Sequence, residues 1–169
     1  MNPRLLVTDP DTVLLQIFRA YFPHYSLDVA TARDGLECVE SLRTFAPDVL
    51  VLSLELHWGG ADGVLSMVRE ESQMRPIPVI LTVGEINRTR AVEYLRPPVV
   101  KLLEKPFRLR DLRAIVADAL HTHVQYPTAG VAPAPAQFEP SQFANADAVL
   151  ISERNSLTTH THQEETRYV

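Results

Sequence analysis

Four positions that could carry chemistry stand at the ends of short apolar runs that are far apart in the sequence. A carboxylate, Asp9, follows the first run, a hydroxyl, Ser53, closes the third, and an amine, Lys105, follows the last. The fourth position closes the run before residue 84, where either Thr82 or Val83 occupies it. In open parallel sheets the site lies at the carboxyl ends of the strands, so we expect these positions to converge there.

A serine close to a lysine has the composition of an activated nucleophile, because a neighbouring amine can take the hydroxyl proton. The sequence around Ser53 shows no evident oxyanion hole or substrate pocket to support such a reaction. We expect Lys105 to form an ion pair with Asp9 instead. The sequence therefore does not predict an enzyme.

Five apolar runs alternate with five segments whose apolar residues recur at helical spacing. The third run, which follows Pro47-Asp48 and ends at Ser53, is apolar throughout, as expected of a strand buried on both faces. The predicted strands are 5–8, 26–32, 49–53, 79–83 and 99–103. The predicted helices are 13–21, 36–42, 62–68, 85–95 and 109–120, with Asp11 and Asp62 as N-caps. Strands that alternate with helices imply right-handed crossovers and a parallel sheet covered on both faces, a three-layer α/β sandwich.

The composition of the 169 residues limits the class of function. A net charge of -5, without clustered Lys and Arg, argues against a nucleic-acid partner. The single Cys38 excludes an internal disulfide and a multi-cysteine zinc site, and it fits a reducing compartment. No segment reaches the roughly 18 apolar residues of a membrane helix, and the start is too short for a signal peptide. We expect a cytoplasmic protein without membrane contact.

The composition changes after about His123, where prolines stand among Ala, Thr, Gly and Gln. This is typical of a linker, so we predict a domain at 4–121 and a Pro/Ala-rich linker with a disordered tail at 122–169. One apolar patch, Ala148-Val149-Leu150-Ile151, is an alternative docking element for the domain or for a partner.

Residues 4 to about 121 resemble the receiver domain of two-component response regulators. The resemblance depends on five local signatures: Leu5-Leu6-Val7-Thr8-Asp9, Thr31-Ala32-Arg33-Asp34-Gly35, Pro47-Asp48, Asp62-Gly63 and Lys105-Pro106-Phe107. It implies the flavodoxin-like strand order 2-1-3-4-5. It also implies phosphoryl transfer from a histidine kinase to an aspartate at the end of the third strand, with Mg²⁺ held by that aspartate and by an acidic pair after the first strand.

The phosphorylation site of the family is degenerate in this sequence. The phosphoacceptor position falls on Ser53, which cannot form an acyl phosphate and supplies no carboxylate. Asp9 matches the first acid of the pair, but its neighbour, the usual metal ligand, is Pro10. With Asp9 alone, Mg²⁺ would keep nearly all of its waters, so we expect weak or absent Mg²⁺ binding and no other cofactor.

The positions that contact the phosphoryl group and transmit its signal are also altered. Thr82 and Lys105 correspond to the residues that contact the phosphoryl oxygens, with Val83 as the alternative for the first of them. The switch aromatic of the family corresponds to Leu102. Pro106 is the candidate for a cis bond, because cis peptide bonds are essentially confined to proline. In the family, the phosphoryl group, a hydroxyl on the fourth strand and an aromatic side chain act together. This sequence has neither the phosphoacceptor aspartate nor the aromatic side chain.

Other side chains near the site are candidates to replace the missing groups. Asp11 lies near the acidic pair but is expected to cap the first helix, and Glu55 is expected to face solvent. Trp58, in a loop longer than that of the family, is either an exposed anchor or a cover for the pocket. Two His-x-His pairs are expected to be solvated rather than metal-binding: His121 with His123, and His160 with His162.

The sequence thus predicts a pseudo-receiver, a single-domain response regulator that acts by protein–protein contact without aspartate phosphorylation. Its expected partners are signalling proteins such as a histidine kinase, or a second copy bound through the fourth helix, fifth strand and fifth helix. Five arginines are expected to make that surface locally basic: Arg88, Arg90, Arg96, Arg108 and Arg110. Two alternatives stay open. One is a conventional phosphorelay receiver that uses Glu55 or Asp11, and the other is a scaffold whose tail is the recognition element.

Overall fold

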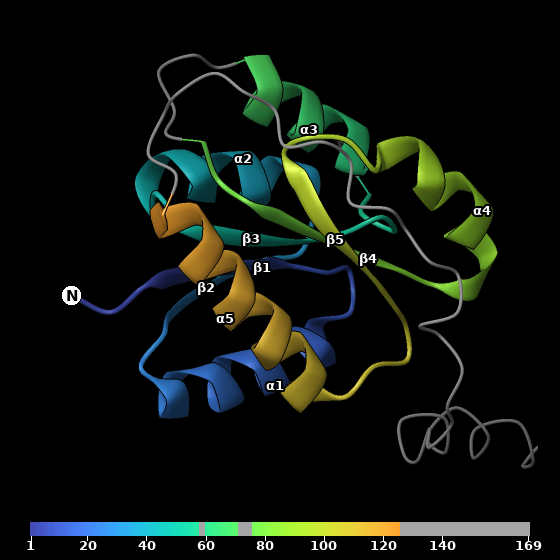
Figure 1. Ribbon diagram of the computed structural model, residues 1–169. Coiled ribbons are helices and arrows are strands. Elements are labelled where there is room, and N and C mark those ends of the chain that lie inside the picture. Colours follow the sequence, from blue (N-terminus) through green and yellow to red (C-terminus); the bar gives the residue numbers. More distant parts are fainter. Residues whose placement is uncertain (58–59, 71–75, 126–169) are drawn as a thin grey trace, which may run out of the picture. The chain divides into compact units, whose positions relative to one another are not determined.

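The apolar run that ends at Ser53 is the central strand of a five-stranded parallel sheet (Figure 1). The strands are β1 (Arg4–Thr8), β2 (Asp28–Ala32), β3 (Val49–Ser53), β4 (Val79–Val83) and β5 (Val99–Glu104). Their order is β2-β1-β3-β4-β5, with every neighbouring pair parallel. The predicted sheet and strand order are confirmed.

In this computed structural model, residues 1–57, 60–70 and 76–125 are described. They belong to one unit, Met1–Ala136, and a second unit, Gln137–Val169, lies outside the described residues. The predicted tail with its apolar patch at 148–151 is therefore not described, and the domain boundary at 121/122 stays a prediction.

Helices cover both faces of the sheet, which gives the predicted three-layer arrangement (Figure 1). The helical elements are α1 (Thr12–Tyr21), η1 (Phe22–Tyr25), α2 (Gly35–Thr44), α3 (Gly60–Glu70), η2 (Glu85–Asn87), α4 (Arg88–Ala91), η3 (Val92–Tyr94) and α5 (Leu109–Gln125). α1 and α5 pack on one face, and α2 and α3 pack on the other. None of the described helices combines the length and apolarity that a membrane crossing requires.

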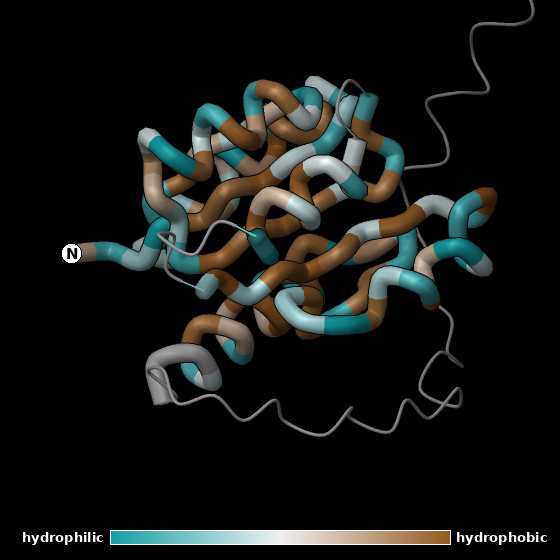
Figure 2. Tube along the Cα trace, turned by 90° about the horizontal axis from the view of Figure 1, so that it is seen from above, coloured by the Kyte–Doolittle hydropathy of each residue, from teal (hydrophilic) through white to brown (hydrophobic). Residues whose placement is uncertain are grey.

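Alternate side chains of β3 enter two separate cores, because successive residues of a strand point to opposite faces. Val49 and Val51 lie in the α1/α5 core with Phe18 and Leu112, whereas Leu50 and Leu52 face α2 and α3. Figure 2 shows the hydrophobic segments gathered along the strands, with hydrophilic ones outside. Each fully buried aliphatic side chain contributes about 1.5–3 kcal/mol relative to an exposed one. The buried β3 therefore fixes the position of Ser53 at its end.

The predicted helix starts are confirmed at one position and wrong at another. Asp11 caps α1, since its Oδ1 accepts from the backbone N–H groups of Val13 (2.9 Å) and Leu14 (3.2 Å). Asp62 is not an N-cap, because α3 already begins at Gly60. Asp62 instead lies in the first turn of α3, where an acidic side chain is favoured by the helix dipole.

The predicted fourth helix, 85–95, is three short pieces rather than one helix. η2, α4 and η3 have three, four and three residues, and none of them has a side-chain cap hydrogen bond. Thr89 and Val92 are β-branched, which lowers helix propensity in a segment with weak periodicity. The fifth strand and fifth helix extend beyond their predicted ends, to Glu104 and Gln125.

Candidate functional site

The ammonium of Lys105 joins the polar groups at the carboxyl edge of the sheet. Its Nζ donates to Asp9 Oδ2 at 2.5 Å, to Glu55 Oε2 at 2.9 Å and to Ser53 Oγ at 3.1 Å. Asp9 and Ser53 are buried, and the Lys105 side chain is 23% exposed. The predicted ion pair between Lys105 and Asp9 is confirmed.

Hydrogen bonds between strands hold these groups in place. The hydroxyl of Thr8, in β1, donates to the Val51 carbonyl at 3.1 Å and accepts from Ser53 N at 3.2 Å, so it fixes the end of β3. Asp9 Oδ1 accepts from Asp11 N at 3.0 Å. Lys105 N donates to the Val83 carbonyl at 2.8 Å. The bond between Lys105 and Pro106 is cis, as predicted.

Glu55 lies in the pocket, so the expectation that its side chain faces solvent is wrong. Its Oε2 accepts from Ser53 Oγ at 2.9 Å, and its Oε1 accepts from Gly84 N at 2.6 Å. The side chain is 26% exposed. The flanking Leu54 and Leu56 are both buried, and an ammonium at the sheet edge attracts a second carboxylate. The apolar–acidic–apolar alternation after Ser53 was the sequence signal for this position.

The environment of Glu55 lowers the pKa of its carboxyl group. Burial by itself raises this pKa, because it penalises the charged form. The hydrogen bond from Gly84 N, the hydrogen bond and charge of Lys105, and the Ser53 hydroxyl act in the opposite direction and outweigh burial. Glu55 is therefore ionised at neutral pH, and its charge faces that of Lys105.

The donor set does not fit the Mg²⁺ that the family places here. Mg²⁺ requires a near-octahedral array of oxygens, and Pro10 offers no side-chain oxygen. The oxygens of Asp9, Glu55 and Ser53 instead surround the Lys105 ammonium. Within the ranges 1–57, 60–70 and 76–125, no group of three or more His, Cys, Asp or Glu side chains could hold a metal ion. In the structure these oxygens thus bind the Lys105 ammonium.

The two candidates for the fourth position face different sides of the sheet. The β3–β4 register pairs Ser53 with Thr82, so these residues point to the same face. Val83 belongs with Leu102 to the core on the opposite face, together with Ala91 and Tyr94. Thr82 is therefore the hydroxyl beside Ser53, and Val83 is the strand-four residue that shares a core with the switch position.

Most of the remaining side chains singled out in the sequence are not described by the structure. Trp58, the His123 side chain, His160 and His162 lie outside the described residues. His121 is exposed, and its Nδ1 lies 2.6 Å from the Ala117 carbonyl.

Three of the five arginines expected to make the surface around the fourth and fifth helices basic lie next to carboxylates. Arg88 pairs with Glu104 at 2.8 Å, and Arg90 pairs with Asp62 at 2.9 Å. Arg110 lies 3.6 Å from its neighbour Asp111. Carboxylates from α3, β5 and α5 therefore compensate much of the arginine charge, which the helix sequence alone did not indicate.

A hollow of about 210 Å³ lies beside the pocket. Its lining consists of Gly84, Glu85, Arg88, Glu104, Lys105 and Pro106. Gly84 and Lys105 both donate hydrogen bonds to Glu55. A small solute can therefore approach the Glu55 contacts from this side.

The strand order and the polar site at the carboxyl edge define a doubly wound α/β domain of the flavodoxin-like order. The family model described as "Response regulator receiver domain" matches residues 5–117, so the chain belongs to this family. The predicted family membership is confirmed, and the chain is a receiver domain of the kind used in two-component signalling.

Known relatives and solved structures agree with this family. The chain is 26% identical over 121 residues to the transcription factor SKN7 of Candida albicans, covering 70% of this chain and 21% of that protein. It is 27% identical over 124 residues to the transcriptional regulatory protein ZraR of Escherichia coli O157:H7, covering 73% and 28%. The receiver domain of Francisella response regulator 1452 matches with a TM-score of 0.64 at 25% identity, covering 72% of this chain and 98% of that one. The chain spans less than a third of either curated relative.

Proposed function

We propose that this chain is a pseudo-receiver that acts by protein–protein contact, independently of aspartate phosphorylation and without catalysis. The observation that carries the proposal is the hydrogen bonding of Ser53. Its side chain supplies no carboxylate, and its hydroxyl is engaged by Glu55 and Lys105. Ser53 replaces the nucleophile of the family, Pro10 replaces the second metal ligand, and Leu102 replaces the switch aromatic. These three replacements disable the chemistry and leave the fold intact.

The proposal extends to how the switch is lost. In the family, a hydroxyl on strand four and an aromatic on strand five respond together to the phosphoryl group. Val83 shares a core with Leu102, whereas Thr82 points to the other face. We assign the strand-four switch position to Val83, so that the coupled pair is Val83 and Leu102. Neither side chain is polar or aromatic, which supports a domain with a fixed output.

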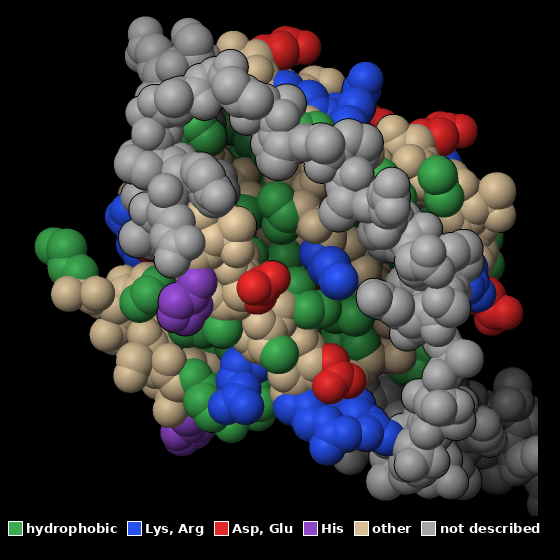
Figure 3. All heavy atoms as spheres, viewed as in Figure 1, with side chains coloured by type: hydrophobic (Ala, Val, Ile, Leu, Met, Phe, Trp, Pro, Cys, Tyr) green, Lys and Arg blue, Asp and Glu red, His purple; other side chains and the backbone are tan. Residues whose placement is uncertain are grey.

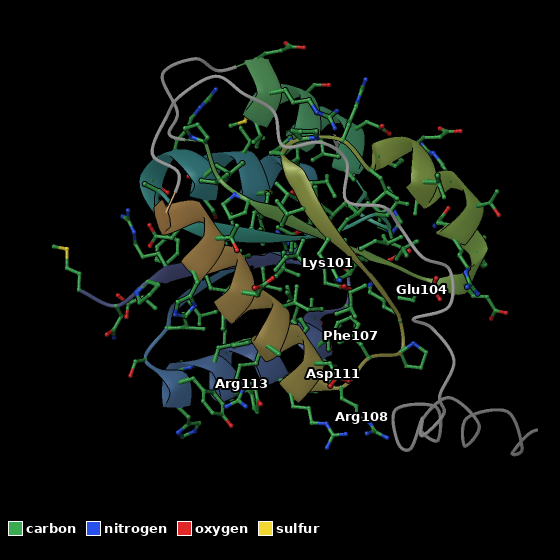
Figure 4. The ribbon with its side chains drawn as sticks, in the orientation of Figure 1. Lys101, Glu104, Phe107, Arg108, Asp111 and Arg113 are labelled. Carbon is green, nitrogen blue, oxygen red and sulfur yellow. The ribbon has the colours of Figure 1, made fainter. Side chains whose placement is uncertain are left out.

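The proposed contact surface consists of η2, α4, η3, β5 and α5. Three apolar side chains on it are exposed: Ile86 (97%), Val92 (64%) and Val100 (53%). Hydrophobic and charged side chains are interspersed on the viewed face (Figure 3), and the labelled side chains of β5 and α5 lie on that same face (Figure 4). The proposed partner is a signalling protein such as a histidine kinase, or a second copy of this chain. Exposed apolar side chains together with paired charges suit such a contact.

Substitution of Val92 tests this surface. Val92→Glu places a charge among the exposed apolar groups and is expected to abolish self-association or partner binding. Val13→Glu is the matched control, because Val13 on α1 is exposed to a similar extent (60%). Sedimentation velocity over a range of concentrations, and partner capture, give the readouts. Equal effects of the two variants would overturn the assignment of the surface.

Titration with Mg²⁺ and beryllofluoride tests the loss of phosphorylation. Trp58 is the single tryptophan of the chain and reports on the loop after β3 by its fluorescence. No saturable, metal-dependent change is expected, and acetyl phosphate with Mg²⁺ is expected to leave the intact mass unchanged. A saturable response would overturn the pseudo-receiver.

A second candidate is a receiver that uses Glu55 as a non-standard carboxylate. The observation in its favour is the direct contact of Glu55 with Lys105. In this case the wild-type protein would gain a phosphoryl group from acetyl phosphate, and Glu55→Gln would not. The Ser53→Ala variant would still be labelled, which separates a carboxylate acceptor from a hydroxyl acceptor.

The scaffold alternative assigns recognition to the residues that follow the domain. Because α5 extends to Gln125, a chain that ends there retains every described element. Pull-downs with this shortened chain address the alternative. Unchanged partner binding would exclude it, and lost binding would support it.

A further inference from the structure

We propose that Glu55 is a built-in substitute for a phosphoryl group, whose carboxylate occupies an anion site and holds the segment from Gly84 to Tyr94 in one conformation. This inference rests on the proposed function, because it explains how a receiver without phosphorylation keeps a defined contact surface. Nothing in the sequence signatures of the family assigns such a role to position 55.

Donors from three separate strand ends converge on the Glu55 carboxylate. Oε2 accepts from Ser53 Oγ, at the end of β3, and from Lys105 Nζ, after β5, both at 2.9 Å. Oε1 accepts from Gly84 N, after β4, at 2.6 Å. Asn87 Nδ2 lies 3.5 Å from the same oxygen. Charge-assisted hydrogen bonds of this kind are shorter and stronger than neutral ones.

Gly84 allows the carboxylate to approach this closely. A Cβ atom at position 84 would lie 3.2 Å from Glu55 Oε1 and 3.7 Å from its Cδ. A contact of 3.2 Å is tighter than most Cβ contacts, so a side chain here would require the carboxylate to shift by a few tenths of an ångström. The glycine and the glutamate therefore form a matched pair across two loops.

The segment that Gly84 begins depends on such a tether. η2, α4 and η3 have at most four residues each, and helices this short are not stable by their own hydrogen bonds. Gly84 is the N-cap residue of η2, and Asn87 N donates to the Gly84 carbonyl. The Glu55 contacts to Gly84 and Asn87 thus fix the start of the segment that carries Ile86 and Val92.

Other contacts hold the same segment farther along. Arg88 pairs with Glu104, and Arg90 pairs with Asp62 and lies over the Tyr94 ring at 5.7 Å. Ala91 and Tyr94 are buried. These contacts anchor α4 and η3, whereas Glu55 holds the η2 end through Gly84 and Asn87. Removal of Glu55 is therefore expected to loosen η2 most.

The site without Glu55 would be a receptor for a small anion. Lys105 Nζ, Gly84 N and Ser53 Oγ would remain as donors, and Gly84 and Lys105 line the hollow of about 210 Å³ that opens beside them. Acetate carries the same carboxylate as the glutamate side chain and is small enough for this volume. Truncation of Glu55 followed by rescue with acetate therefore isolates the role of the anion.

Amide hydrogen exchange measures the tether directly. Glu55→Ala is expected to accelerate exchange of the amides in residues 84–94 by about tenfold, since a charge-assisted hydrogen bond is lost. Amides of β1 and β3 are expected to keep their wild-type rates, which shows that the variant is folded. Glu93→Gln, at an exposed glutamate of η3, is the control and should exchange as wild type. Acetate should restore protection in Glu55→Ala, and chloride at equal ionic strength should not.

Further variants keep the test decisive. Glu55→Gln preserves shape without charge and should behave as Glu55→Ala, and Gly84→Ala should loosen the same amides with Glu55 still present. Unchanged exchange in Glu55→Ala, wild-type exchange in Glu55→Gln, or no effect of acetate would each overturn the proposal.

The exchange experiment on Glu55 and the acetyl phosphate experiment on the proposed function can fail independently. Wild-type protein labelled by acetyl phosphate would overturn the pseudo-receiver while the exchange data still supported the tether. Unlabelled protein with unchanged exchange in Glu55→Ala would overturn the tether alone.

Discussion

Lys105 Nζ donates to Asp9 Oδ2 at 2.5 Å, across a sequence separation of 96 residues. This bond connects the end of β1 with the end of β5, on either side of the central strand. Asp9 is buried, and a buried charge needs a partner. The lysine thus supplies the counter-charge that the buried Asp9 carboxylate needs.

Loss of the Lys105 ammonium is expected to destabilise the domain. Lys105→Met leaves Asp9 and Glu55 facing each other without a counter-charge. Removal of one partner of a buried pair costs about 3–5 kcal/mol, and partial exposure of Lys105 reduces the expected loss to about 2–3 kcal/mol. Urea unfolding gives the free energy of unfolding. Lys101→Met, at an exposed lysine of β5, is the control and should change it by less than about 0.5 kcal/mol.

A double-mutant cycle assigns this loss to the ion pair. Asp9→Asn combined with Lys105→Met should be less destabilised than the sum of the single variants, because the unpaired charge is gone. Additive free energies would contradict a direct interaction between the two side chains.

Glu55 is expected to give the domain an acid-sensitive component of stability. Its pKa in the folded protein lies below its usual value of about 4.3. A lowered folded-state pKa means that the unfolded chain binds the proton more readily. The contribution is therefore fully present above the usual pKa and is lost as the pH falls through the folded pKa.

Unfolding free energies of wild type and Glu55→Gln between about pH 3 and 7 check this sign. The difference between the two proteins should be largest at neutral pH and should shrink below about pH 4.3. Glu93→Gln should run parallel to wild type. A difference that grows toward low pH would show that the pKa of Glu55 is raised instead.

The Cys38 thiol is expected to be unreactive in the folded protein. Burial, with a smaller effect of Asp34, raises its pKa to about 12, and only the thiolate attacks disulfide reagents. Dithionitrobenzoate at neutral pH should label the native protein only as it unfolds. Ser66→Cys, at an exposed position of α3, should react at once and serves as the control. Rapid labelling of the wild type would contradict the burial of Cys38.

The fold and the Lys105–Asp9 pair could be predicted because both follow from strand ends. Apolar runs locate the strands, and the residue after each run lies at one sheet edge. The position of Glu55 could not be deduced in this way, since it depends on the burial of Leu54 and Leu56 and on the attraction of Lys105.

The prediction of one helix at 85–95 was wrong for a similar reason, because tertiary contacts determine the structure of this segment. Residues 85–95 show weak periodicity, and their three short pieces are held by contacts with Glu55, Asp62 and Glu104 rather than by helix propensity. The sequence did not reveal the ion pairs of Arg88 and Arg90, because Glu104 and Asp62 lie on other elements. The local sequence pattern locates a helical segment, but contacts with residues distant in the sequence decide whether it is one helix or several short pieces.

Restoration of the phosphorylation site is expected to require two substitutions. Ser53→Asp alone supplies an acceptor carboxylate, but Pro10 still offers no oxygen to Mg²⁺, so acetyl phosphate should not label this variant. Ser53→Asp with Pro10→Asp supplies both carboxylates beside Asp9 and should be labelled in a Mg²⁺-dependent manner. Intact mass with Mg²⁺ or with EDTA gives the readout. Ser53→Asp with Pro10→Ala separates the added carboxylate from the loss of proline and should stay unlabelled. Labelling of the single variant would show that Asp9 and the new Asp bind Mg²⁺ without help from position 10.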